Sequence, residues 1–180
     1  SSDLKQSHTE IFPVDMGMVT DTKVRTDHKV AYGTQNMTKG PAMTRDQAVK
    51  GIEGGIAMVK ELKDKGYKIL ATGEMGIGNT TTSSAVASVL LNQPVEEMTG
   101  RGAGLTSEGL IRKIRAIKKA IELNRPDPSD AVDVLAKVGG LDIAGMAGVF
   151  LGGAVYRIPV VMDGFISCVS ALIAMQICPA

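Results

Sequence analysis

The chain has 180 residues, a formal net charge of +1 at pH 7 and 44% hydrophobic residues. This length suits one domain with a sizeable core. The balanced charge gives no indication of binding to nucleic acid or to an anionic membrane surface, and the chain has no tryptophan with which to stack on bases.

The composition also bears on the cellular compartment. Residues 158–178 form the most apolar stretch, but Asp163 and Gly164 divide it into a strand-sized and a helix-sized piece, so we expect no membrane span. Cys168 and Cys178 lie ten residues apart in a predicted helix, roughly 15 Å at the usual rise, too far for a disulfide. We therefore expect buried free thiols and a cytoplasmic protein.

The first predicted elements precede residue 66. Residues 1–10 are polar and expected to be loose, 11–14 form a short apolar run expected to be a strand, and 19–40 form a long polar connection that suits a lid or an oligomer arm. Thr44 and Gln47 have the spacing of a capping box, which predicts a helix ending near Gly66. Three glycines weaken this helix, which indicates close packing on a neighbouring helix or a second subunit; they are Gly51, Gly54 and Gly55.

A glycine turn follows the apolar run 67–71 and precedes a small-residue helix predicted over 80–91. Gly73, Gly76 and Gly78 let the backbone approach a ligand closely. The unpaired N–H groups at the start of the helix, after Asn79 and at Thr80, favour a phosphate or carboxylate. Glu74 lies inside this turn, so we expect a phosphorylated small molecule with a reacting centre.

Two alternatives compete for the same turn. Its spacing fits a P-loop except that Asn79 stands where the phosphate-binding lysine belongs, which makes an ATPase or GTPase a poor fit. The turn could also serve packing alone. Glu74 argues against that interpretation, because a purely structural turn needs no carboxylate.

A second glycine cluster, residues 99–104, holds Arg101 among residues that allow close approach. Ser107 is the expected cap of a helix running to Leu123, whose apolar stripe is Leu110, Ile114, Ile117 and Ile121. Lys113 flanks that stripe. Periodicity leaves two interpretations open: Lys113 reaches into a cleft, or it is a snorkelling surface lysine like Lys118.

The remaining elements complete an α/β pattern. Helices are predicted over 130–137, 141–156 and 165–177, with a strand over 157–162. Asp15, Glu74 and Asp163 each follow an apolar run and precede a glycine. If these runs are parallel strands, the three acids meet at the carboxyl edge of one sheet, where α/β folds bind ligands.

Several motifs together resemble one family, nicotinate-nucleotide:dimethylbenzimidazole phosphoribosyltransferase, of cobalamin nucleotide-loop assembly. They are GEMGIGNTT at 73–81, TGRGAGL at 99–105, KVGGL at 137–141 and PVVMDGF at 159–165, supported by GTQN at 33–36 and GPAMTR at 40–45. The resemblance runs from about residue 12 to the last residue.

The resemblance implies a homodimeric enzyme with a Rossmann-like parallel sheet flanked by helices. It implies transfer of phosphoribose from nicotinate mononucleotide to 5,6-dimethylbenzimidazole, giving α-ribazole 5′-phosphate and nicotinate, with neither metal nor organic cofactor. It also implies site residues. Glu74 and Asp163 would act at the ribose; the substrate-binding residues would be Gly76, Gly78, Asn79, Thr80, Arg101, Lys113 and Gly164.

The sequence also departs from the family. Members are longer at both ends, and their general-base glutamate lies in a C-terminal motif that this chain lacks. We therefore expect residues 11–180 to be the large domain of a truncated chain, without the small domain. The alternative function is a catalytically incomplete core that binds a nucleotide or benzimidazole.

Overall fold

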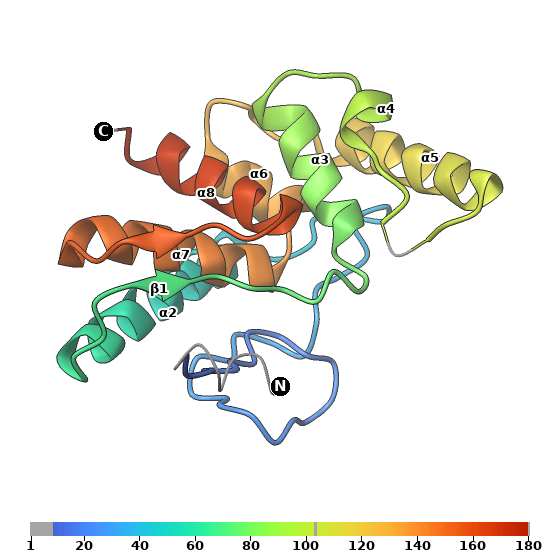
Figure 1. The fold of residues 1–180 in the computed structure, drawn as a ribbon. Helices are drawn as coiled ribbons and strands as arrows, with labels where there is room; N and C mark the ends of the chain where they lie inside the picture. Colours follow the sequence, from blue (N-terminus) through green and yellow to red (C-terminus); the bar gives the residue numbers. More distant parts are fainter. Residues whose placement is uncertain (1–8, 103, 180) are drawn as a thin grey trace.

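The computed structural model describes residues 9–102 and 104–179. Helices predominate in the described ranges, and Figure 1 shows them around a short pair of strands. In chain order the elements are α2 (Arg45–Asp64), β1 (Leu70–Ala71), α3 (Thr80–Leu90), α4 (Val95–Met98), α5 (Ser107–Asn124), α6 (Ala131–Val138), α7 (Leu141–Tyr156), β2 (Val160–Val161) and α8 (Phe165–Ile177).

The sheet confirms the predicted α/β class. β1 and β2 run parallel, with Leu70 opposite Val160, and the N–H of Thr72 donates to the carbonyl of Val161 at 3.1 Å. Both strands are shorter than the predicted 67–71 and 157–162. The chain between the two strands forms α3 to α7. Because the strands are parallel, their carboxyl ends lie side by side at the same edge of the sheet.

The expected strand at 11–14 is wrong in the described residues. Val14 forms only an isolated parallel bridge with Arg25, through the N–H of Asp15 and the carbonyl of Arg25 at 2.8 Å. Pro13 has no N–H to donate to a ladder, which suits it to an edge or to a loop rather than to a sheet. The N-terminal segment, blue in Figure 1, therefore forms a large loop instead of a third strand.

The glycines of α2 confirm close packing on a neighbouring helix, which is α7. A Cβ on Gly55 would lie 2.0 Å from the carbonyl oxygen of Gly145, and one on Gly148 would lie 2.0 Å from that of Ile52. The two backbones therefore touch without intervening side chains. The predicted capping box is present as well, with Thr44 and Gln47 each bonded to the other's backbone N–H.

The core lies where the helices meet. Each of five helices contributes a fully buried aliphatic side chain to one cluster: Val86, Ile117, Leu135, Ile143 and Ile173. This cluster joins α3, α5, α6, α7 and α8 in one core. Within the described residues, no helix is long and apolar enough to cross a membrane.

The cysteines correct one expectation. Cys168 and Cys178 are free thiols, as predicted, but both are exposed rather than buried. The apolar character of α8 suggested burial throughout. However, the helix buries only one face, which carries residues such as Ile166, Val169 and Ile173. Cys168 lies outside this face and is exposed.

The N-terminal loop is tied to α2 by charge. Arg25 forms ion pairs with Asp27 and with Glu61 of α2, and Lys65 pairs with Glu61 at 2.6 Å. The hydrogen bonds from Arg25 and then Lys65 lower the pKa of Glu61 to about 2. The loop is thereby held by a carboxylate that stays ionised in all but strong acid.

We predict that this tie gives part of the acid sensitivity of the fold. Because the folded pKa of Glu61 is depressed, its stabilisation is present above about pH 4.5 and is lost as the pH falls toward 2. The Glu61→Gln variant should lose less stability than the wild type between pH 7 and pH 3 in urea unfolding. Glu53→Gln, an exposed position of the same helix, is the control. Identical acid profiles for Glu61→Gln and the wild type would contradict the prediction.

Candidate functional site

The predicted glycine turn joins β1 to α3. Gly76 and Gly78 have φ of 76° and 82°, a region in which other residues are strained, so the turn depends on them. The carboxylate of Glu74 folds back and accepts a hydrogen bond from the N–H of Gly76. The N–H of Gly76 is thus used by the turn's own carboxylate, and the binding of substrate at Gly76 and Gly78 stays a prediction.

A cavity of about 180 Å³ opens at the carboxyl ends of the two strands. It brings together four of the predicted site residues, Glu74, Thr80, Asp163 and Gly164, and is completed by Phe165, Ile166 and Ser167. Two acidic residues, each from the loop after a different strand, thus line one small space that also touches the starts of α3 and α8. This part of the sequence-based site forms as the strand–acid–glycine pattern indicated.

Asp15 does not join the other two acids around this cavity. It is 2% exposed, and one carboxylate oxygen accepts from the N–H groups of Gly17 and Met18 at 3.0 and 2.7 Å. The other oxygen binds Thr22 and Lys29 at 2.8 and 3.0 Å. The three-acid prediction is therefore wrong for Asp15, because local donors in its own loop use the carboxylate.

Lys113 is buried, so the snorkelling interpretation is wrong; it is not among the residues that line the cavity, so its reach into a cleft stays a prediction. The residue is 7% exposed, and its Nζ donates to the Thr80 hydroxyl at 2.9 Å and to the Gly100 carbonyl at 3.1 Å. Burial lowers the pKa of the ammonium group. Within the described residues none of the ion pairs includes Lys113, so a buried cation stands at the start of α3 without a counter-charge.

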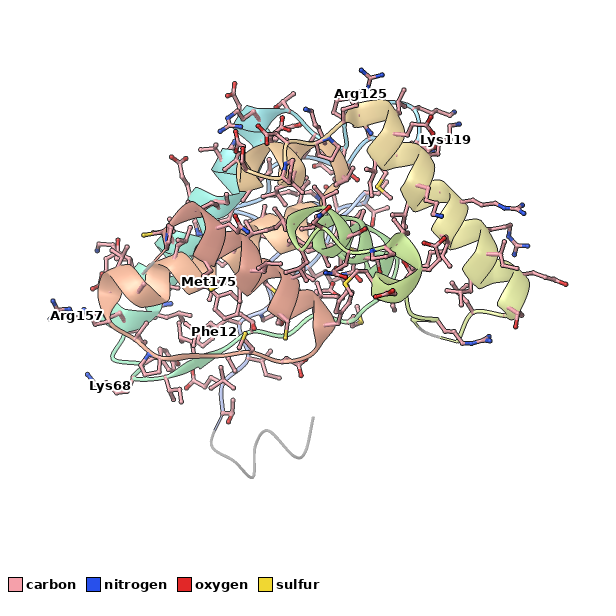
Figure 2. The ribbon with its side chains drawn as sticks, turned by 90° about the horizontal axis from the view of Figure 1, so that it is seen from above. Phe12, Lys68, Lys119, Arg125, Arg157 and Met175 are labelled. Carbon is pink, nitrogen blue, oxygen red and sulfur yellow. The ribbon has the colours of Figure 1, made fainter. Side chains whose placement is uncertain are left out.

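The other basic side chains behave differently. Lys118 lies on the surface and pairs with Glu96. Figure 2 shows Lys119, Arg125 and Arg157 at the periphery of the molecule. Lys113 is the lysine that α5 turns inward, and its small neighbours in the sequence gave the only signal for this.

Arg101 lies beside the site but is engaged by its own loop. Its guanidinium donates to the Leu105 carbonyl at 2.9 Å and to the Ser107 hydroxyl at 3.1 Å. Ser107 was the predicted cap of α5; the cap is instead Thr106, whose hydroxyl accepts from the N–H of Gly109 at 3.1 Å. A role for Arg101 in ligand binding stays a prediction.

Asn79 makes a contact that sequence reasoning missed. Its Nδ2 donates to Oδ2 of Asp142, in the first turn of α7, at 2.6 Å. Burial raises the pKa of Asp142, the charge of Glu74 adds to this, and the hydrogen bond from Asn79 opposes it. The available signal was a single acid two residues after Gly140, in the first turn of an otherwise apolar helix.

The arrangement suits a phosphate on one side and developing positive charge on the other. A helix N-terminus with a buried ammonium group binds anions, and facing carboxylates stabilise a cation. Among the described residues no group of three metal-ligating side chains gathers. The expectation of a reaction without metal or cofactor stays a prediction.

Comparison with known proteins adds independent information. A family model described as Phosphoribosyltransferase matches residues 4–180. The nicotinate-nucleotide–dimethylbenzimidazole phosphoribosyltransferases of Ruminiclostridium cellulolyticum and Clostridium acetobutylicum are each 56% identical over 97% of this chain. The chain spans about half the length of these curated relatives, 50% of each.

A solved structure is similar as well. The crystal structure of CobT from Thermus thermophilus superposes with a TM-score of 0.91 at 34% sequence identity. The superposition covers 99% of this chain and 54% of that protein.

Proposed function

This chain belongs to the phosphoribosyltransferase family whose model matches residues 4–180, and we propose that it carries the mononucleotide site of a pentosyltransferase of cobalamin biosynthesis. The reaction transfers phosphoribose from nicotinate mononucleotide to 5,6-dimethylbenzimidazole. The names of the relatives, at 56% identity, support these two substrates.

The observation that carries the proposal is the buried ammonium group of Lys113. A buried cation without a counter-ion is costly, and an anionic ligand removes that cost. Its Nζ is 2.9 Å from the hydroxyl of Thr80, the first residue of α3, and Thr80 also lines the cavity with Glu74 and Asp163. The 5′-phosphate of a mononucleotide would bind at this helix start, with its ribose over the two carboxylates.

The chemistry follows from that placement. The bond from the anomeric carbon to the nicotinate nitrogen breaks, and a benzimidazole nitrogen bonds to the same carbon. Nicotinate leaves with the electron pair, and the second benzimidazole nitrogen loses its proton to a base. Positive charge builds on the ribose in between, where Glu74 and Asp163 would stabilise it. A general base for the final proton contributes about 10²–10⁴-fold.

A second candidate function is binding of the mononucleotide without turnover. It is favoured by one fact: the chain spans half the length of the relatives that carry the activity in their names. In this case residues 11–180 form the large domain and supply the phosphate and ribose contacts, while the acceptor pocket and the base belong to the part of the relatives that these 180 residues do not span.

Assembly and compartment are further parts of the proposal. We expect a homodimer, as the family resemblance implies, and a cytoplasmic enzyme. Two exposed cysteines that remain free thiols suit a reducing compartment.

An assay of the 180-residue chain tests the proposal. We expect α-ribazole 5′-phosphate to form from the two substrates, and Glu74→Gln to lower its rate by about 10²-fold, the usual worth of one electrostatic contact to the transition state. Glu97→Gln, an exposed acid on α4, is the matched control and should leave the rate unchanged.

The outcomes separate the two candidates. Mononucleotide binding without product favours the binding core. A chain that neither binds the mononucleotide nor forms product contradicts the proposal. A large fall in melting temperature for Glu74→Gln would instead make the turn's carboxylate structural.

A further inference from the structure

Among the helices whose N-cap side chain can accept a hydrogen bond, α3 differs from α2, α5 and α6. Thr44, Thr106 and Asp130 each accept a hydrogen bond from the first turn of their own helix. Asn79 is the N-cap of α3, and asparagine is among the best residues for that role, yet its side chain makes no capping bond. Those three caps have an extended backbone, whereas Asn79 has a helical φ of −109° and ψ of −7°, which turns its carboxamide away from the first turn.

In this orientation the carboxamide contacts Asp142. The 2.6 Å hydrogen bond from Nδ2 of Asn79 to Oδ2 of Asp142 joins the start of α3 to the start of α7. Asn79 is 9% exposed, and its Oδ1 is buried without a partner in the described part of the chain. An unpaired buried acceptor is unfavourable, and capping the helix would have satisfied it. The structure thus gives up a favourable local bond in order to keep the longer one.

The consequence is a set of open donors. In the described residues, no side chain or loop carbonyl accepts from the N–H groups of Thr81 and Thr82, which are the usual partners of a cap. No acidic residue lies in the first turn of α3. The adjacent Thr80 holds the Lys113 ammonium group. Free N–H groups and a cation are therefore both found at the start of α3.

We propose that Asp142 is a positioning residue of the phosphate site: it draws the Asn79 carboxamide off α3, so that the N–H groups of Thr81 and Thr82 stay free for the substrate's phosphate. This inference rests on the proposed function, because it assumes that the anion is the 5′-phosphate of nicotinate mononucleotide. Asp142 acts through Asn79 and does not touch the substrate.

Charge alone would give the opposite effect. Asp142 and the phosphate are both negative, so deletion of the carboxylate should strengthen anion binding if electrostatic repulsion dominates. Deletion should weaken binding if it lets Asn79 cap its own helix and occupy the donors. The sign of the change in affinity therefore distinguishes the two roles.

Calorimetric titration of the full 180-residue chain with nicotinate mononucleotide provides the test. We expect Asp142→Ala to bind about fivefold more weakly, the usual worth of a competing cap. Asp142→Asn keeps an acceptor for Nδ2 of Asn79 and should restore wild-type affinity. In Asn79→Ala, which has no carboxamide to compete, the further change Asp142→Ala should have no effect on affinity.

A ligand-free measurement accompanies the titrations. Amide hydrogen exchange at Thr81 and Thr82 should be slower in Asp142→Ala than in the wild type, because the freed Asn79 protects these groups. Affinity in Asp142→Ala that equals or exceeds the wild type, or exchange that is unchanged, would overturn the inference.

The proposed function fails separately. If the wild-type chain does not bind nicotinate mononucleotide, the proposed function is wrong, and so is the assignment of the anion as the 5′-phosphate of this substrate. Slower exchange in Asp142→Ala would then still establish that Asp142 holds Asn79 off the helix. Weaker binding by Asp142→Asn as well as Asp142→Ala would also count against the inference, since the hydrogen bond is kept in the former.

Discussion

Replacing Lys113 by methionine is expected to weaken binding of nicotinate mononucleotide by about 1.5–3 kcal/mol, the usual worth of hydrogen bonds to a charged group. The same change should raise the melting temperature of the ligand-free chain, because a buried ammonium group that has no carboxylate partner among the described residues is replaced by an apolar side chain of similar length. Isothermal and scanning calorimetry measure the two effects. Lys119→Met, on the exposed face of the same helix, is the matched control.

The pH dependence of stability gives the same prediction a second readout. Because the pKa of Lys113 is lowered in the folded state, folding at neutral pH carries the cost of a buried charge. Above the folded pKa the native state sheds this proton before the unfolded state does, so wild-type stability rises with pH toward 10.5. The stability difference between Lys113→Met and wild type should therefore narrow in alkaline solution. A variant that is both less stable and equally tight in binding would contradict a ligand-binding role.

The Gly55→Ala variant is expected to lose about 3 kcal/mol or more of the free energy of unfolding, at the upper end of overpacking effects. The added Cβ would lie 2.0 Å from the Gly145 carbonyl and 2.8 Å from the Cα of Gly148. Both are backbone atoms of α7, so no side chain can turn aside, and the helices must separate.

Gly54→Ala, one residue earlier, is the matched control. Its Cβ would meet only side-chain atoms, at 3.3 Å from His28 and 3.4 Å from Met16. Replacement of a helical glycine by alanine otherwise stabilises by about 1 kcal/mol. In urea unfolding, the two variants should therefore change the free energy of unfolding in opposite directions or by very different amounts. Equal losses would mean that the contact between α2 and α7 does not limit packing.

Local sequence signals were sufficient for the parts of the fold that are set by short-range chemistry. The Thr44 capping box, the glycine turn and the small-residue helix after Asn79 all form where they were expected. Each depends on neighbours within a few residues. The strand at 11–14 failed because its pairing depends on which distant segment approaches, and Arg25 of the same loop is closer than the sheet.

The site shows the same division. Glu74 and Asp163 meet because each follows a strand, and strands 90 residues apart become adjacent by a simple parallel pairing. Lys113 is buried because the loop that carries Gly100 lies against it, and the helical periodicity of residues 107–124 gives no information about that loop. Asp142 was missed because its partner, Asn79, lies 63 residues away.

The two-stranded sheet has a consequence for how the chain behaves in solution. β1 and β2 pair only with each other in the described residues, so each presents one row of main-chain donors and acceptors to its surroundings. Such edges accept further strands, including those of another molecule. Ile69 and Val161 are 61% and 50% exposed beside them, while the charge of Lys68 and the missing N–H of Pro159 work against pairing. We therefore expect these edges to be hydrated in dilute solution and to promote self-association as the protein concentration rises.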